Sequence, residues 1–198
     1  MRKKSIRLAA RTFNSNIDEI ISFTNRATGA GGPLTDQDQS WCFDLAIIRV
    51  YREFEDLILS CLVALINSDA TTFSQVKGRK FPAHMNVEVC EYLICGDGYF
   101  DFAGRDGLIK TIKKVVPAAH WLPTIVSDAA YTDALKKLSA LRNFAAHDSA
   151  VSKKRALDAI GGQGMSSSGA WLKRQGRFAA MCTSLKAMST RIEAAAPY

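Results

Sequence analysis

The sequence lacks an apolar run long enough to cross a membrane. Its longest candidate, Leu57–Ile66, is shorter than the roughly 18 residues that a bilayer requires, and Ser60 interrupts it. The basic residues 1–7 lead into no long apolar core with a cleavage site, so the sequence does not indicate a secretory signal. We therefore expect a protein that resides in the cytoplasm and does not enter a membrane.

Metal-ligand spacing is also missing. The five cysteines form no Cys-x-x-Cys pair, and the sequence has no His-x-x-x-His or paired Cys/His spacing. His84 and His120 stand alone in segments that we expect to be loops. We therefore expect no metal site and no cofactor, and we interpret most of the cysteines as reduced, buried core residues.

What is present is the composition of a globular protein. Hydrophobic residues make up 47% of the 198 positions and charged residues 23%, which argues against a disordered or collagen-like chain. The net charge of +7 is uneven: +5 in residues 1–11, −4 in residues 12–150 and +6 in residues 151–198. Positively charged ends attract phosphates, although basic termini are also common as solvated decoration.

Apolar residues recur at helical spacing through most of the chain, with no run of regularly alternating strands. The pattern predicts an all-α bundle of about six helices, forming a single domain over residues 1–198. Residues 1–13 are expected to be a basic N-terminal arm, with a capping signal at Ser15 starting the first helix. Residues 161–169, rich in Gly and Ser, are expected to be a flexible loop before a C-terminal helix at about 170–194.

A second, long helix is expected to open at Thr35, after a loop at residues 29–33, and to run for roughly thirty residues. We expect its core-facing stripe to contain Trp41, Leu45, Ile48, Phe54/Glu55, Leu59, Leu62 and Ile66. After a polar connection with a basic cluster at Lys77, Arg79 and Lys80, a short helix at 85–95 ends at Gly96. Pro117 and Pro123 then bracket a loop that contains His120 and Trp121.

One predicted helix, which begins near Asp128, carries reactive side chains on its polar flank. At about 100° per residue, Tyr131 and the leucines and alanines that follow form an apolar face. Arg142 lies at the border of this face, and the opposite stripe contains Lys136, Ser139, Asn143 and His147. Asn143 and His147 are four residues apart, so we expect the amide to reach the imidazole and hold its orientation.

Arg142 and His147 suit phosphodiester chemistry. A histidine takes or gives a proton near neutral pH. An arginine offers a rigid set of donors to phosphate oxygens and stays charged as negative charge builds up. Because RNA supplies its own nucleophile, the 2′-hydroxyl, such a site needs no metal. The alternative interpretation is that both residues simply cap or decorate the end of a helix.

Residues 141–147, Leu-Arg-Asn-Phe-Ala-Ala-His, resemble the signature of the HEPN superfamily: an Arg, four to six residues, then a His, often with Asn after the Arg. Residues 50–59 resemble the early helix of its RiboL-PSP-HEPN branch, in which a Tyr and an acidic residue precede an apolar run. Residues 98–102, followed by 108–112, resemble the middle segment of that branch. The resemblance covers roughly residues 40–150.

The resemblance implies an all-α bundle that pairs as a homodimer, with two Arg–His motifs facing each other across one cleft. It implies a metal-independent endoribonuclease for single-stranded RNA, as found among toxins and anti-phage defence proteins, with an antitoxin or defence-system protein as a further partner. Arg142 would hold the scissile phosphate, His147 would transfer the proton at the 2′-oxygen or the leaving oxygen, and Asn143 would position both. The products would carry a 2′,3′-cyclic phosphate and a 5′-hydroxyl. A toxin subgroup carries a Tyr, modified by its antitoxin, two places after the His, and Ser149 departs from that pattern here.

Further charged residues are candidates for the same site. We interpret four cations as an RNA path or, alternatively, as solvated helix faces: Lys136, Lys153, Lys154 and Arg155. Glu55, on the long helix, either pairs with Arg142 or His147 or, as we favour, lies at the rim of the core. The alternative function is a non-catalytic HEPN-like module that dimerises or binds a partner protein or a nucleotide through the same cleft.

Overall fold

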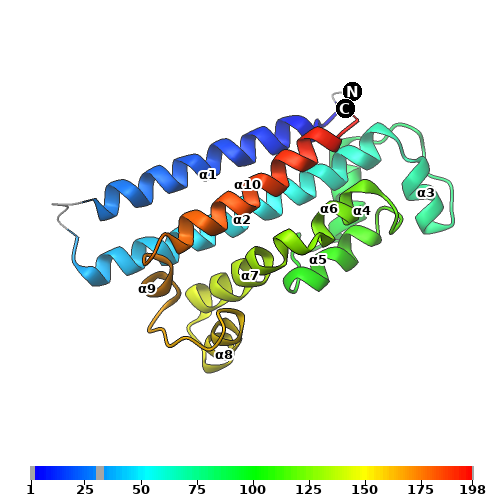
Figure 1. The fold of residues 1–198 in the computed structure, drawn as a ribbon. Coiled ribbons are helices and arrows are strands. Elements are labelled where there is room, and N and C mark those ends of the chain that lie inside the picture. Colours follow the sequence, from blue (N-terminus) through cyan, green and yellow to red (C-terminus); the bar gives the residue numbers. More distant parts are fainter. Residues whose placement is uncertain (1–2, 30–33, 198) are drawn as a thin grey trace. The chain divides into compact units, whose positions relative to one another are not determined.

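The computed structural model describes residues 3–29 and 34–197, and the regular structure in these ranges is entirely helical. The all-α prediction is confirmed (Figure 1). The described residues form ten α-helices and one short 3-10 helix, more than the six or so expected. Three of the additional helices lie in segments that the sequence pattern assigned largely to connections: α3 (Thr71–Lys77), α6 (Trp121–Ser127) and α9 (Ser168–Leu172).

Three helices are longer than the remainder. They are α1 (Ile6–Thr28), α2 (Asp36–Ser68) and α10 (Arg177–Ala195). The other elements are α4 (Val87–Cys95), α5 (Gly104–Lys113), the 3-10 helix η1 (Ala129–Tyr131), α7 (Thr132–His147) and α8 (Ala150–Ala159). No single helix in the described ranges is long and apolar enough to cross a membrane, and α2 and α3 pass that test only together, across a bend of 101°.

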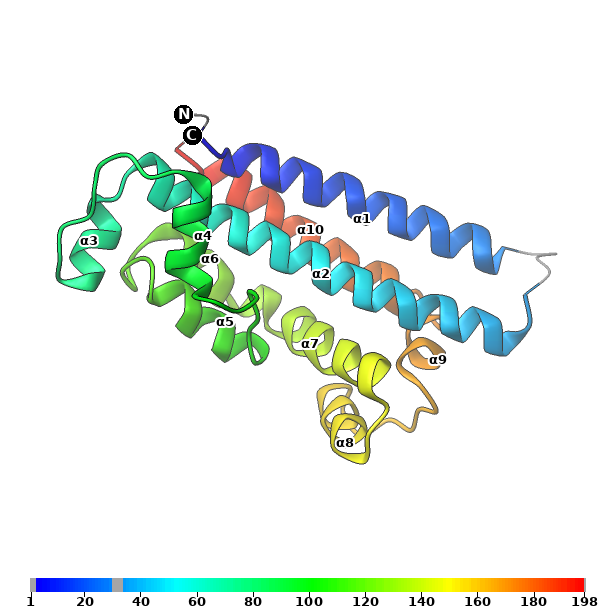
Figure 2. The same cartoon turned by 180° about the vertical axis from the view of Figure 1, so that it is seen from behind.

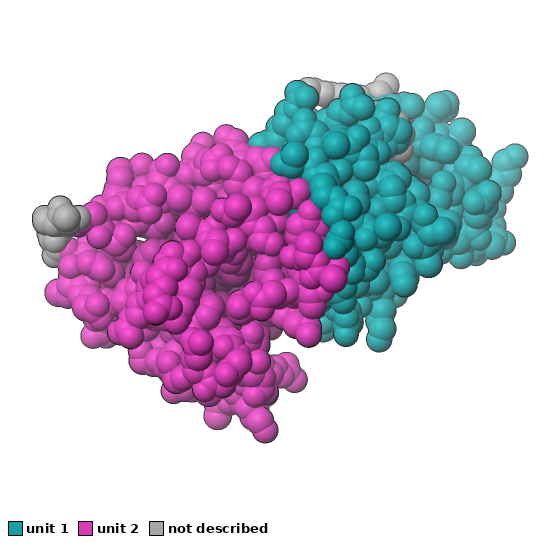
Figure 3. Space-filling model, in the orientation of Figure 1, with its two compact units in different colours: residues 1–13, 54–128, 188–198 teal, residues 14–53, 129–187 magenta. Residues whose placement is uncertain are grey.

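The described chain divides into two compact units (Figure 3). Unit 1 takes its described residues from 3–13, 54–128 and 188–197, and unit 2 from 14–29, 34–53 and 129–187. The helices α1, α2 and α10 each contribute one part to unit 1 and another to unit 2. Hydrophobic periodicity shows that a helix has a buried face but not which core each turn enters, so the sequence alone predicts a single domain.

The expected N-terminal arm is instead the beginning of α1. The helix starts at Ile6, and Ile6, Ala10 and Phe13 are buried within unit 1. These residues continue the spacing of the apolar positions that follow, so Ser15 lies inside the helix and does not cap it. Residues 1–2 of the expected arm, and residues 30–33 of the loop after α1, lie outside the described residues.

The start of α2 follows the predicted local signals. The Thr35 backbone N–H and hydroxyl donate to Asp38 Oδ2 at 2.9 and 2.7 Å, and the Asp38 N–H donates to Thr35 Oγ1 at 3.2 Å. This reciprocal pair satisfies backbone groups that the first turn of a helix otherwise leaves without partners. Two residues with complementary side chains at the right spacing therefore decide where the helix begins.

The predicted core stripe of α2 is wrong in its first half. Trp41 and Leu45 are 56% and 65% exposed, whereas Phe43, Ile47 and Tyr51 are buried. In unit 2 the Phe43 ring packs against a ring of α10, that of Phe178, at a centroid distance of 5.3 Å. This half of α2 is apolar on two faces, so helical spacing alone does not indicate which face meets the core.

The loop expected around His120 contains a helix start. The His120 Nδ1 atom accepts a hydrogen bond from the Leu122 backbone N–H at 3.2 Å and so caps α6. Pro123 lies in the first turn of that helix, where the missing N–H of a proline costs little. Histidine is not among the preferred capping residues, which is why the sequence predicts a loop here.

Acidification is expected to weaken unit 1 through this cap. Burial lowers the pKa of His120 below the ordinary 6.5, and a protonated Nδ1 can no longer accept the bond from Leu122. Between the lowered pKa and 6.5 the unfolded chain binds more protons than the folded chain, so the free energy of unfolding falls as the pH falls through this window. Urea unfolding of the His120→Asn variant, which keeps a capping oxygen without titrating, should show a weaker pH dependence between about pH 7.5 and 5. An equal pH dependence in both proteins would contradict the assignment.

Candidate functional site

The candidate residues lie on α7, within unit 2. Leu135, Leu138 and Leu141 are buried and fix the orientation of the helix, as predicted. Ser139, expected on the polar stripe, is also buried. The next helix, α8, packs against α7 (Figures 1 and 2). The C-terminal half of α7 therefore combines one packed face with one that contacts solvent.

Arg142 is held in place by two neutral groups. Its guanidinium carbon lies 4.5 Å from the centre of the Tyr51 ring on α2, and its Nη1 atom donates to Asn143 Oδ1 at 2.8 Å. The side chain is half-buried, and within the described residues no carboxylate pairs with it. An aromatic ring and an amide orient a guanidinium without neutralising it. The arrangement leaves the positive charge available to an anion.

Asn143 has a different partner from the predicted one. Its side-chain oxygen accepts from Arg142, whereas the spacing of four residues predicted a bond to His147. Because the guanidinium is a charged donor, it is the stronger partner for the amide oxygen. The role that the structure assigns to Asn143 is to position Arg142.

His147 is the last residue of α7 and is exposed. In the part of the chain that the structure describes, its side chain makes no hydrogen bond or ion pair. Asp148 follows in the left-handed conformation, with φ 39° and ψ 44°, and ends the helix. The His147 side chain is accessible to solvent and to a substrate, as an acid or base must be.

The basic residues of α8 come soon after His147 in the chain, because Ser149 caps α8 and lets the helix begin at Ala150. The Ser149 hydroxyl accepts from the Ser152 N–H at 3.1 Å, and the Ser149 N–H donates to Ser152 Oγ at 3.0 Å. The Ser149 side chain thus has a structural role at this position. Only two residues separate His147 from α8.

Lys136 lies on α7 itself, and of the three predicted RNA-path cations on α8 one contacts a ring of α7. The Lys153 ammonium lies 5.9 Å from the centre of the Phe144 ring, one residue after Asn143. The other three are exposed and make no ion pair with any described residue: Lys136, Lys154 and Arg155.

Glu55 lies on α2, one helical turn after Tyr51, and is half-buried. Glu55 lies in the part of α2 that belongs to unit 1, whereas Arg142 and His147 belong to unit 2. Its pairing with either of them stays a prediction.

A depression of about 380 Å³ adjoins the end of α7 and was not predicted from the sequence. Its lining includes Trp41 and Leu45 of α2 and Ala145 and Asp148 at the end of α7. Asp44 also lines it: its Oδ1 atom accepts the Gly169 N–H at 2.6 Å, and burial raises the pKa of its carboxyl above the usual range. Asp44 thus attaches α9 to α2.

Tyr51 is the functional candidate that sequence reasoning missed. It belongs to the segment 50–59 that the sequence singled out, but as part of a pattern and not as the platform for Arg142. The sequence shows only a large aromatic residue on a predicted helix, and this pattern does not predict which cation stacks on its ring.

In residues 3–29 and 34–197, no group of His, Cys, Asp and Glu side chains is placed to hold a metal ion. The five cysteines are free, and Cys61, Cys90 and Cys182 are buried as expected. Burial raises the pKa of Cys61 and of Cys182 to about 12, so these thiols stay protonated and unreactive.

Comparison with known proteins gives no match to a family model, to a curated protein or to a solved structure.

Proposed function

We propose that the protein is a cytoplasmic, HEPN-like, metal-independent endoribonuclease that cleaves single-stranded RNA at a site containing Arg142 and His147. The observation that carries the proposal is the environment of the Arg142 guanidinium. Tyr51 and Asn143 orient it, but no described carboxylate neutralises its charge. A fixed, uncompensated guanidinium five residues before an exposed histidine suits a phosphate flanked by a proton-transfer group.

The proposed reaction uses the ribose 2′-hydroxyl as nucleophile. An imidazole accepts the 2′-hydroxyl proton while the 2′-oxygen bonds to phosphorus and the bond from phosphorus to the 5′-oxygen breaks. The leaving 5′-oxygen receives a proton from an imidazolium, which in a homodimer is supplied by the second copy. Arg142 donates to the non-bridging oxygens, whose negative charge grows in the transition state. The products are a 2′,3′-cyclic phosphate and a 5′-hydroxyl.

The charge of unit 2 supports RNA as the substrate. Lys153 lies against Phe144 of α7, and Lys154 and Arg155 are exposed on the same helix as Lys153. Cations that contact phosphates provide affinity without sequence selectivity. We propose a toxin or anti-phage defence role, with an antitoxin or defence-system protein as partner, on the strength of the HEPN-like motif.

A non-catalytic interaction module is the competing function. It would be favoured by a His147 buried against its own chain, but this side chain is exposed. The two functions make different predictions for purified protein, since only the enzyme alters RNA.

The test is cleavage of a labelled single-stranded RNA in the presence of EDTA. The purified full chain is expected to cut the RNA equally well with EDTA and with magnesium, because the proposed site supplies its positive charge from Arg142. Binding of RNA without cutting under either condition would favour the interaction module. Cutting that requires magnesium would refute the proposed mechanism.

A further inference from the structure

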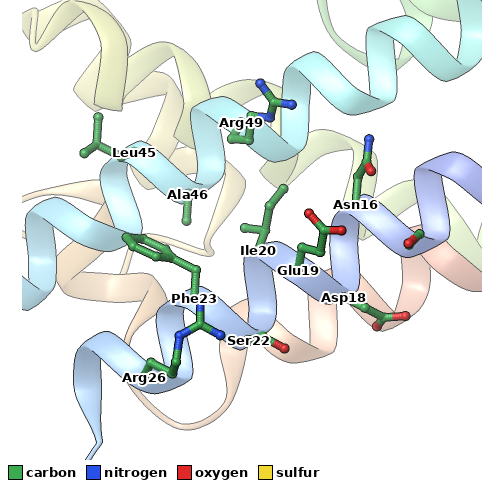
Figure 4. Close-up of a pocket in the computed structure, with 11 residues that line it drawn as sticks. Asn16, Asp18, Glu19, Ile20, Ser22, Phe23, Arg26, Leu45, Ala46 and Arg49 are labelled. Carbon is green, nitrogen blue, oxygen red and sulfur yellow. The ribbon is translucent and has the colours of Figure 1, made fainter.

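A groove of about 830 Å³ lies between α1 and α2 on unit 2 (Figure 4). The α1 wall contains Ile20 and Phe23, and the α2 wall contains Leu45 and Ala46. Figure 4 shows the Phe23 ring reaching from α1 toward Ala46. The groove thus has an apolar centre between two parallel ridges, a shape that accepts another helix.

The apolar surface around this groove is unusually open to solvent. Phe23 is 45% exposed and Leu45 is 65% exposed, and Trp41, one turn earlier on α2, is 56% exposed. A cluster of large exposed apolar side chains on a soluble unit marks an interaction surface. The sequence pattern predicted Trp41 and Leu45 as core residues, and contact with another chain would bury them.

Two of the four charged residues that line the groove already have partners. Asp18 pairs with Lys186 at 2.5 Å. Arg49 pairs with Glu53 at 2.6 Å, and that carboxylate also accepts from Asn16 at 2.6 Å. These charges stabilise unit 2 itself and are not free to select a partner.

Glu19 and Arg26 are the other two charged residues of the lining. Both are exposed on α1 and line the groove, and neither forms an ion pair or side-chain hydrogen bond with any residue in 3–29 or 34–197. They are seven residues apart, which is two turns or about 10 Å along the helix. Phe23 lies between them along the helix (Figure 4). The apolar centre therefore has an unpaired negative charge at one end and an unpaired positive charge at the other.

This arrangement is complementary to itself. If a second α1 lies antiparallel across the groove, with a two-fold axis between Ser22 and Phe23, Glu19 of each copy faces Arg26 of the other. The same symmetry places each Phe23 ring opposite the small side chain of Ser22 in the other copy. A two-fold interface requires one patch to match its own image, and opposite charges at equal distances from the axis meet that requirement.

We propose that this groove is the surface on which a second copy of the chain docks, with the two α1 helices antiparallel and Glu19 paired with Arg26 of the other copy. Leu45 lines both this groove and the depression beside Ala145 and Asp148, so the docked copy would lie next to the end of α7. The inference names the partner surface of the proposed ribonuclease, and its use in catalysis rests on that proposed function. The docking surface itself, with its charge pairs and its apolar centre, can be tested without measuring RNA cleavage.

A charge-exchange experiment on the full chain tests the pairing. Glu19→Arg alone would place two pairs of like positive charges across the interface, and Arg26→Glu alone would do the same with negative charges. We expect each single change to raise the dimer dissociation constant by at least about tenfold, and the double change Glu19→Arg/Arg26→Glu to restore it. Sedimentation velocity over a range of concentrations provides the measurement, with circular dichroism to show that each variant is folded.

Two apolar substitutions complete the design. Leu45→Glu should make the protein monomeric, whereas Leu8→Glu, at a position on α1 that is 59% exposed but lies outside the groove, should leave the dimer intact. A monomeric wild-type protein, or single charge changes that the double change does not rescue, would overturn the inference. A rescued dimer that cuts no RNA would overturn the proposed function alone, and a monomer that cuts RNA would overturn this inference alone.

Discussion

Arg142→Ala should abolish RNA cleavage while the protein stays folded. The substitution removes the guanidinium that Tyr51 and Asn143 orient and that we propose donates to the phosphate. Loss of one oriented donor to a developing negative charge typically costs about 10²–10³ in rate, and loss of a cation costs at least as much. Because the lost stacking contact stabilises the fold by only about 1 kcal/mol, the melting temperature should fall by a few degrees at most.

His147→Ala should have a similarly large effect on cleavage and almost none on stability. The side chain is exposed at the end of α7, so removing it leaves no cavity. The lost proton transfer is expected to lower the cleavage rate by about 10²–10⁴-fold. The measurement for both variants is the initial rate of RNA cutting in EDTA at a saturating RNA concentration.

Matched controls are available in unit 1 for both residues. Arg79 also stacks on an aromatic ring, with its guanidinium carbon 4.8 Å from the centre of Phe81, and His84 is exposed. Arg79→Ala and His84→Ala should cut RNA at nearly the wild-type rate. If the control variants and the α7 variants lose activity equally, or if none loses it, the assignment of the site to α7 is wrong.

Gly169→Ala is expected to destabilise unit 2 by about 3 kcal/mol. A Cβ atom at this position would lie 1.8 Å from the backbone oxygen of Ser40, inside α2, which cannot move aside as a side chain would. The Gly169 N–H donates to Asp44, and the neighbouring Ser168 hydroxyl donates to the Leu141 carbonyl oxygen at 2.8 Å. The substitution therefore forces α9 away from both α2 and α7.

Gly164→Ala provides the control for this prediction. Gly164 belongs to the same Gly/Ser-rich segment, but a Cβ atom there would meet no atom within 4 Å. Urea unfolding should show a large loss for Gly169→Ala and almost none for Gly164→Ala. Because Leu141 directly precedes Arg142, Gly169→Ala should also slow RNA cleavage. Equal stability of the two variants would contradict the close approach of α9 to α2.

Signals that act within a few residues predicted some helix ends correctly, although the capping signal at Ser15 was wrong. Thr35 and Asp38 start α2 by bonding to each other, and Gly96 ends α4 in a conformation with φ 64° that other residues rarely adopt. The Gly/Ser-rich segment was harder, because Ser167 accepts the Ala170 N–H and starts α9 inside the expected loop. Whether such a short helix forms depends on what it packs against, which neighbouring residues do not encode.

The orientation of helix faces was predicted less well. Trp41 and Leu45 match a helical stripe as well as Phe43 and Ile47 do, yet only the second pair is buried. Arg142 and His147 lie together on α7, as the helical spacing of the apolar residues around them predicted. Tyr51, which holds Arg142 from another helix, could not be found because its contact depends on how α2 and α7 pack.

The most direct test of the central claim is the chemical identity of the ends that the protein leaves on RNA. Fragments made in EDTA should be analysed by mass spectrometry, with an RNA that carries 2′-deoxyribose at the cleaved position as the second substrate. The proposed chemistry predicts 2′,3′-cyclic phosphate and 5′-hydroxyl ends, and no cleavage at the deoxy position. Ends with a 3′-hydroxyl and a 5′-phosphate, or cleavage at the deoxy position, would contradict it.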